Sequence, residues 1–195
     1  MDTALTAEIV LQGYRAGAFP MADEDGEILW FSPDPRCIFP LDAFHIPRSV
    51  RQVISRGQFD VRVNTAFDQV IAACAERGEG TWISDDIMRV YRALHRGGYA
   101  HSVECWQGDV LGGGLYGVSI GGAFFGESMF TRITNASKVA LAALVERLRT
   151  RGFTLLDTQW NTPHLERFGA VEIPRREYVR RLRAALALPV RFVDG

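Results

Sequence analysis

Three polar side chains lie in otherwise apolar stretches and could do chemistry together. Asp157 and Gln159 stand two residues apart in LLDTQW, and Glu127 follows the phenylalanine-rich run in GAFFGES. Alternate residues of a strand share a face, so Asp157 and Gln159 are predicted to point the same way. Buried polar groups need partners. Two interpretations stay open here: hydrogen bonds and an Arg–Glu pair that hold the fold, or contacts that bind and polarise a substrate.

Seven glycines accompany Glu127 between residues 112 and 126. They match neither a GxGxxG loop that opens a helix nor a P-loop. We interpret them as clearance, either for an extended ligand lying against a strand or for a bulge. The three cysteines and four histidines are scattered, without zinc-ligand spacing and without a Ser-His-Asp order. Neither a metal site nor a nucleophilic triad is therefore predicted.

Composition indicates a globular protein without a membrane span. The chain has 195 residues, 47% of them hydrophobic, and a formal net charge of −1. No apolar run approaches the length that a bilayer requires, and the start lacks the pattern of a secretory signal, so we expect a cytoplasmic protein. Charge is uneven: residues 1–100 carry 10 basic and 14 acidic side chains, and residues 101–195 carry 12 and 9. Six arginines between residues 161 and 183 form either a phosphate-binding face or a solvated one.

The first half of the chain is predicted to be a helical layer with one or two strands. Residues 17–27 are predicted to form a polar turn, and residues 28–40 to form one short strand that three prolines interrupt or place at an edge. The helical spacing of apolar residues predicts four helices, at residues 5–16, 46–56, 65–76 and 85–96.

The second half is predicted to supply the sheet on which Glu127, Asp157 and Gln159 stand. Alternating apolar residues predict three consecutive antiparallel strands, and a long helix then leads to a further strand that ends at Gln159. A helix between strands is what a crossover requires. The fold class is therefore α+β, with a mixed sheet flanked by helices. The predicted elements are strands at 100–106, 110–120, 122–130 and 153–159 and helices at 135–152, 162–169 and 175–186.

Seven motifs in order resemble one enzyme family. They are GYRAGAFPM, LWFSPDPR, GTWI, YRALHRGGYAHSVE, GGGLYGVSIGGAFFGESMF, NASKVAL and DTQWNTPHLERFGA. Together they resemble the leucyl/phenylalanyl-tRNA–protein transferases from about residue 5 to about residue 185. WFSP and MFTR stand where the commoner forms are WWSP and MFSR. The resemblance implies a small N-terminal α/β domain, residues 1–38, and a catalytic domain like the GNAT acyltransferases, residues 39–195.

The resemblance also implies an activity. Leucine or phenylalanine, and methionine less well, would pass from aminoacyl-tRNA to the N-terminal amine of proteins that begin with Arg or Lys, marking them for N-degron-dependent degradation. No cofactor or metal is implied, and we expect a monomer. Gln159 would contact the attacking amine, Asp157 would position Gln159, and Glu127 would help hold the cationic acceptor.

The same resemblance assigns the donor's binding residues. Trp30 and Trp82 would lie near the terminal adenosine of the tRNA, and the C-terminal arginines would meet its phosphates. The side-chain pocket would consist of Leu115, Phe124, Met129, Leu141, Leu144 and Leu156.

Two rival hypotheses remain. One is a GNAT N-acetyltransferase that uses acetyl-CoA, although TRITNASK, which enters the long helix, lacks the pyrophosphate-binding loop of such enzymes. The other is a non-catalytic protein that binds tRNA or N-terminal peptides.

Overall fold

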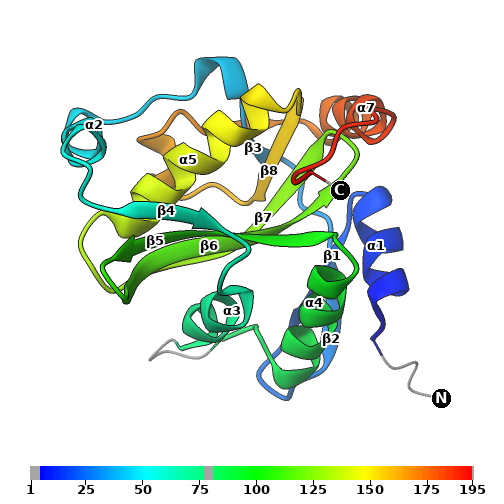
Figure 1. Ribbon diagram of the computed structural model, residues 1–195. Helices are drawn as coiled ribbons and strands as arrows, with labels where there is room; N and C mark the ends of the chain where they lie inside the picture. Colours follow the sequence, from blue (N-terminus) through cyan, green and yellow to red (C-terminus); the bar gives the residue numbers. More distant parts are fainter. Residues whose placement is uncertain (1–4, 77–80, 195) are drawn as a thin grey trace.

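The computed structural model describes residues 5–76 and 81–194, and a seven-stranded sheet is its framework (Figure 1). The strand order is β4-β5-β6-β7-β8-β3-β9. Neighbouring strands are antiparallel except β7 and β8, which are parallel. This confirms the predicted mixed sheet. The strands are β3 (Arg36–Phe39), β4 (Asp60–Val63), β5 (Ala100–Gln107), β6 (Val110–Ile120), β7 (Ala123–Thr131), β8 (Leu155–Gln159) and β9 (Val171–Ile173).

Helices cover both faces of the sheet, as predicted. α5 (Ala136–Thr150) joins β7 to β8 and lies over one face together with α2 (Arg48–Ser55). Because α5 crosses over the sheet, β8 can run parallel to β7. The other face carries α3 (Phe67–Ala75) and α4 (Asp85–Arg96), with α1 (Ala7–Arg15) beside α4 (Figure 1). The remaining helices are η1 (Leu41–Ala43), α6 (Pro163–Glu166) and α7 (Arg175–Leu186).

Three parts of the first half differ from prediction. Phe19–Ala22, within the predicted turn, forms β1 and pairs with β2 (Ile28–Phe31) in a separate hairpin. The single strand predicted over 28–40 is two strands in two different sheets, because Pro33 and Pro35 cannot donate to a continuous ladder. β4 was not predicted at all; it is a short strand at the sheet's edge.

The N-terminal segment shares a core with the larger part of the chain. Tyr14 of α1 and Phe19 of β1 belong to one apolar cluster with Tyr91 of α4 and Tyr116 of β6. The domain boundary expected at residue 38 falls within β3, whose residues pair with β8 and β9. A second apolar cluster fills the space between the sheet and α5.

Glycines in β6 serve close packing. A Cβ at Gly113 would lie 2.6 Å from that of Ala136, so the glycine lets α5 begin against the strand. A Cβ at Gly117 would lie 2.3 Å from the Phe125 carbonyl oxygen, where the β6–β7 register shifts. The bulge interpretation therefore holds opposite Gly117, where Glu127 is the extra residue on β7. Across the described ranges, no helix has the length and apolar character needed to cross a membrane.

Candidate active site

The parallel strands β7 and β8 separate after a short paired stretch. Their pairing joins Ala123–Phe125 to Leu155–Asp157 and ends there. Glu127 and Gln159 each lie two residues beyond the last pair, so no backbone ladder connects them. Their side chains connect instead, because Gln159 Nε2 donates a hydrogen bond to Glu127 Oε1 at 3.0 Å. The separation of the strands thus brings two of the predicted polar residues together.

A cavity of about 340 Å³ opens beside this pair. Its polar lining consists of Glu127, Ser128, Thr158, Gln159, Thr162 and His164. One wall is aliphatic and comes from β6, β7, β8 and α5; it consists of Leu115, Met129, Leu141, Leu144 and Leu156. Another wall is mainly aromatic and consists of Phe19, Met21, Trp82, Tyr116 and Trp160. The cavity can therefore hold an apolar side chain against one wall and a flat ring against another, with a carboxylate within reach of both.

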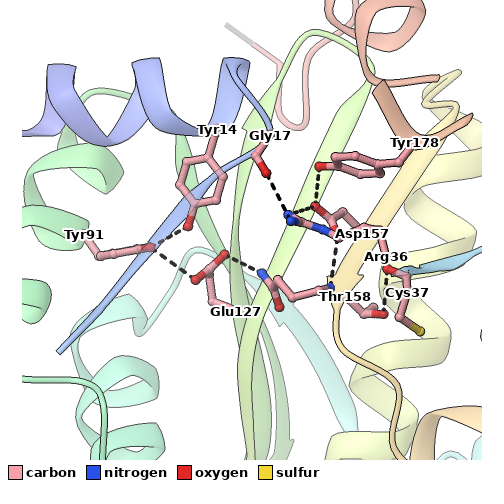
Figure 2. A network of polar contacts seen from close by, with 10 residues as sticks. Tyr14, Gly17, Arg36, Cys37, Tyr91, Glu127, Asp157, Thr158 and Tyr178 are labelled. Atoms are coloured by element: carbon pink, nitrogen blue, oxygen red, sulfur yellow. Dashed lines mark hydrogen bonds and ion pairs between the residues drawn. The ribbon is translucent and has the colours of Figure 1, made fainter. Parts of the chain in front are cut away.

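Glu127 is a carboxylate without an ion-pair partner among the described residues. Tyr91 donates its hydroxyl hydrogen to Glu127 Oε2 at 3.1 Å, and Tyr91 is hydrogen-bonded in turn to Tyr14 (Figure 2). Burial raises the pKa of Glu127 to about 7, and the charge of Asp157 adds to the rise. The tyrosine hydrogen bonds and the Arg36 charge oppose it. Glu127 can therefore gain or lose a proton near neutral pH.

Gln159 is held in an unusual backbone conformation. Its φ is +61°, in the left-handed region that a residue with a side chain rarely adopts. Its backbone N–H donates to Asp157 Oδ1 at 2.9 Å, which stabilises that conformation. The positive φ also breaks the strand alternation, so the prediction that Asp157 and Gln159 point the same way is wrong. Gln159 lines the cavity, whereas Asp157 is fully buried behind it.

Asp157 is surrounded by hydrogen-bond donors. Arg36 Nε and Nη2 bind its two oxygens at 2.9 and 2.7 Å, and the Tyr178 hydroxyl donates to Oδ2 at 2.7 Å (Figure 2). Asp157 is therefore a fixed, charge-paired acceptor that orients Gln159, and it does not line the cavity.

Comparison with known proteins gives the family. The model of the leucyl/phenylalanyl-tRNA protein transferase family matches residues 38–183, and the model of that family's N-terminal domain matches residues 3–34. A protein of Gloeobacter violaceus named leucyl/phenylalanyl-tRNA–protein transferase is 56% identical over 193 residues, which are 98% of this chain and 100% of that protein. The chain belongs to this family. A protein of Salinibacter ruber with the same name is 55% identical, over 95% of this chain and 82% of its own length.

Among solved structures, the C-terminal domain of a putative lysylphosphatidylglycerol synthetase from Agrobacterium fabrum matches with a TM-score of 0.44 and 12% identity. The match covers 94% of this chain and 60% of that one.

The leucyl/phenylalanyl-tRNA–protein transferase resemblance assigned eight binding residues, and the structure brings six of them to the cavity. Leu115, Met129, Leu141, Leu144 and Leu156 form the aliphatic wall, and Trp82 lies on the aromatic one. Phe124 is fully buried, and its ring lies 5.1 Å from that of Phe192 near the C-terminus. Trp30 does not line the cavity either. It lies on β2 against Gly13, with 42% of its surface exposed.

Five residues of this candidate site were not named from the sequence. Arg36, Tyr14 and Tyr91 lie within the motifs that carry the family resemblance, so their positions, though not their contacts, were marked. Trp160 also lies within one of these motifs, DTQWNTPHLERFGA, and it lines the cavity with 43% of its surface exposed. Tyr178 carried no such signal, since it belongs to an ordinary amphipathic helix.

Two further points concern metal binding and the arginine-rich face near the C-terminus. In residues 5–76 and 81–194, no group of three or more His, Cys, Asp or Glu side chains is arranged to hold a metal. The arginines expected to form a basic face are mostly exposed on and before α7, and Glu177 binds both Arg180 and Arg181. That local pairing reduces the positive charge that this face presents.

Proposed function

We propose that this protein moves leucine or phenylalanine, and methionine less well, from aminoacyl-tRNA to the N-terminal α-amine of an acceptor protein. One observation carries the proposal: an aliphatic wall and the Glu127–Gln159 pair share a single cavity. Family membership agrees with a transfer between these two substrates.

The donor's side chain lies against the aliphatic wall in this proposal. Five aliphatic or thioether side chains accept Leu, Phe or Met and offer a charged side chain no partner. A missing methylene changes binding by only about 1–3 kcal/mol, so β-branched residues are excluded more by shape than by size. The terminal adenosine stacks on Trp82 across the cavity, and such stacking contributes about 1–3 kcal/mol per base. Trp30, exposed on the β1–β2 hairpin, offers a second aromatic surface to the tRNA end.

The enzyme mainly has to align the two substrates, because the aminoacyl ester is already activated. The acceptor nitrogen attacks the ester carbonyl carbon, a C–N bond forms, and the bond from that carbon to the ribose oxygen breaks. Holding the two reactants in this geometry can supply about 7–11 kcal/mol. Gln159 contacts the amine, and Asp157 holds Gln159 through its backbone N–H.

Glu127 attracts the protonated amine and takes up its proton. A free α-amine has a pKa of about 8, and the pKa of Glu127 is about 7. The two values are close enough for the ammonium proton to pass to Glu127 before the amine attacks, and the second proton that the nitrogen loses after attack passes to the departing ribose oxygen. A neutral carboxamide is a poor base, so Gln159 orients the amine and does not deprotonate it.

The acceptors begin with Arg or Lys, and the leucylated or phenylalanylated products enter N-degron-dependent degradation. The support for a basic acceptor is the unpaired carboxylate in the cavity of the described chain. Exposed arginines before and on α7 contact tRNA phosphates without reading sequence. The enzyme acts as a monomer in the cytoplasm, where charged tRNA and acceptor proteins meet.

The test is transfer of labelled leucine from charged tRNA to a peptide that begins with Arg. The expected product is the peptide extended by one leucine, and a matched peptide with an acetylated N-terminus should remain unchanged. Calorimetric titration with acetyl-CoA separates the rival acetyltransferase and should show no binding. Absence of leucyl peptide above background, with intact charged tRNA, would refute the proposal.

A further inference from the structure

Arg36 is a buried cation to which the sequence analysis gave no role. Only 1% of its surface is exposed. Besides its two bonds to Asp157, its Nη1 donates to the Gly17 carbonyl oxygen at 3.1 Å. The guanidinium carbon lies 4.9 Å from the centre of the Phe19 ring and 4.6 Å from that of Tyr178. One side chain thus contacts the segment after α1, β1, β8 and α7 (Figure 2).

A gain in folding stability does not by itself explain why Arg36 and Asp157 form a buried ion pair. Burying an ion pair removes two charges from water, and apolar residues of similar volume often make a protein as stable or more so. A bidentate Arg–carboxylate pair provides orientation in addition, because the planar fork permits one relative geometry. The orientation of Asp157 matters here, since its Oδ1 also binds the backbone N–H of Gln159.

The contacts continue from Arg36 into the cavity on two sides. Through Asp157 they reach Gln159, whose strained backbone directs its carboxamide onto Glu127. Through Gly17 and the ring face of Phe19 they reach the aromatic wall, because Phe19 lines the cavity. The Glu127–Gln159 pair and the aromatic wall are thereby both held in place by the buried guanidinium of Arg36.

We propose that Arg36 is a positioning residue for aminoacyl transfer: it fixes Asp157, and through Asp157 the carboxamide of Gln159, relative to the aromatic wall of the cavity. The proposal rests on the proposed function and adds a residue that acts without touching either substrate. Arg36 acts through geometry, so its loss slows the reaction of bound substrates more than it weakens binding of the donor.

The experiment compares Arg36→Lys, Arg36→Met and Tyr178→Phe with Arg151→Met. Arg151 is the matched control, because it also makes a two-donor contact, with Asp194 at 3.1 and 2.8 Å, and does not line the cavity. Three quantities are measured: kcat for leucine transfer, binding of a non-hydrolysable leucyl-adenosine amide, and hydrogen exchange of the Gln159 amide.

Arg36→Met should lower kcat about 100-fold, the usual cost of misplacing reacting groups by about 1 Å. It should change analogue binding less than threefold and speed Gln159 amide exchange. Arg36→Lys, which keeps the charge but not the fork, should fall between wild type and Arg36→Met. Tyr178→Phe should show a smaller loss, and Arg151→Met should behave like wild type.

Equal kcat in folded Arg36→Lys and wild type would overturn the proposal, as would parallel losses of kcat and analogue binding. If Arg36→Met fails to fold, the Lys and Tyr178→Phe variants decide by the same criteria. If the wild-type protein transfers no leucine, the proposed function fails. Positioning is then still judged by Gln159 amide exchange, which must be faster in Arg36→Lys than in Arg151→Met.

Discussion

Replacing Glu127 by Gln should stabilise the protein at neutral and alkaline pH while removing activity. The amide keeps both contacts, since its oxygen accepts from Gln159 and its nitrogen donates to Tyr91. It lacks the charge that burial disfavours. The pKa of Glu127 is raised from 4.5 to about 7, which corresponds to about 3 kcal/mol of differential stability.

The direction in which stability changes with pH follows from proton binding. A raised carboxyl pKa means that the folded state binds the proton more tightly than the unfolded state. The contribution of Glu127 to the free energy of unfolding therefore falls as pH rises from 4.5 through about 7, and is constant above. Relative to Glu127→Gln, wild type should lose about 3 kcal/mol between pH 4.5 and pH 8.

Urea denaturation of both proteins across this range gives the difference directly, and titrations common to both cancel. Glu177→Gln is a suitable control. Its arginine partners lower the pKa of Glu177 to about 2, so its contribution should hardly change between pH 5.5 and pH 8. Wild-type transfer should rise with pH through about 7, and Glu127→Gln should show no transfer above background at any pH in this range. An equal pH dependence of stability in wild type and Glu127→Gln would refute the reasoning.

Two further substitutions test other parts of the site. Leu144→Trp should fill the cavity beside the aliphatic wall and reduce phenylalanine transfer before leucine transfer; an unchanged preference, measured with both charged tRNAs in competition, would mean that the donor side chain binds elsewhere. Asp157→Ala should abolish transfer and also lower the free energy of unfolding by about 3–5 kcal/mol, because it leaves buried Arg36 unpaired. Urea denaturation measures that loss, and a loss below about 1 kcal/mol would show that Arg36 finds water or another partner.

Elements with a clear internal pattern could be predicted from the sequence. Asp85–Arg96 begins after a capping Ser84 and ends at Gly97, and its predicted limits are those of α4. The three antiparallel strands before α5 were predicted for similar reasons, since alternation and turn residues are local signals. β1 was not predicted, because it contains Pro20 and is stabilised by pairing with β2, a contact that local pattern does not encode.

The sequence analysis named Glu127, Gln159 and six further residues that line the cavity, but it did not predict their geometry. Glu127 and Gln159 meet only because β7 and β8 stop pairing beyond Phe125 and Asp157, which no local pattern encodes. The partner of Asp157 is Arg36, 121 residues earlier in the chain. Phe124 departs from its expected place because Phe192, beyond the motifs, packs against it.

A structure of the protein with a non-hydrolysable leucyl-adenosine amide tests the central claim most directly. The leucyl side chain should lie among Leu141, Leu144 and Leu156, with its carbonyl carbon facing Gln159 and Glu127. An analogue bound outside this cavity, or with its side chain turned away from the aliphatic wall, would contradict the account.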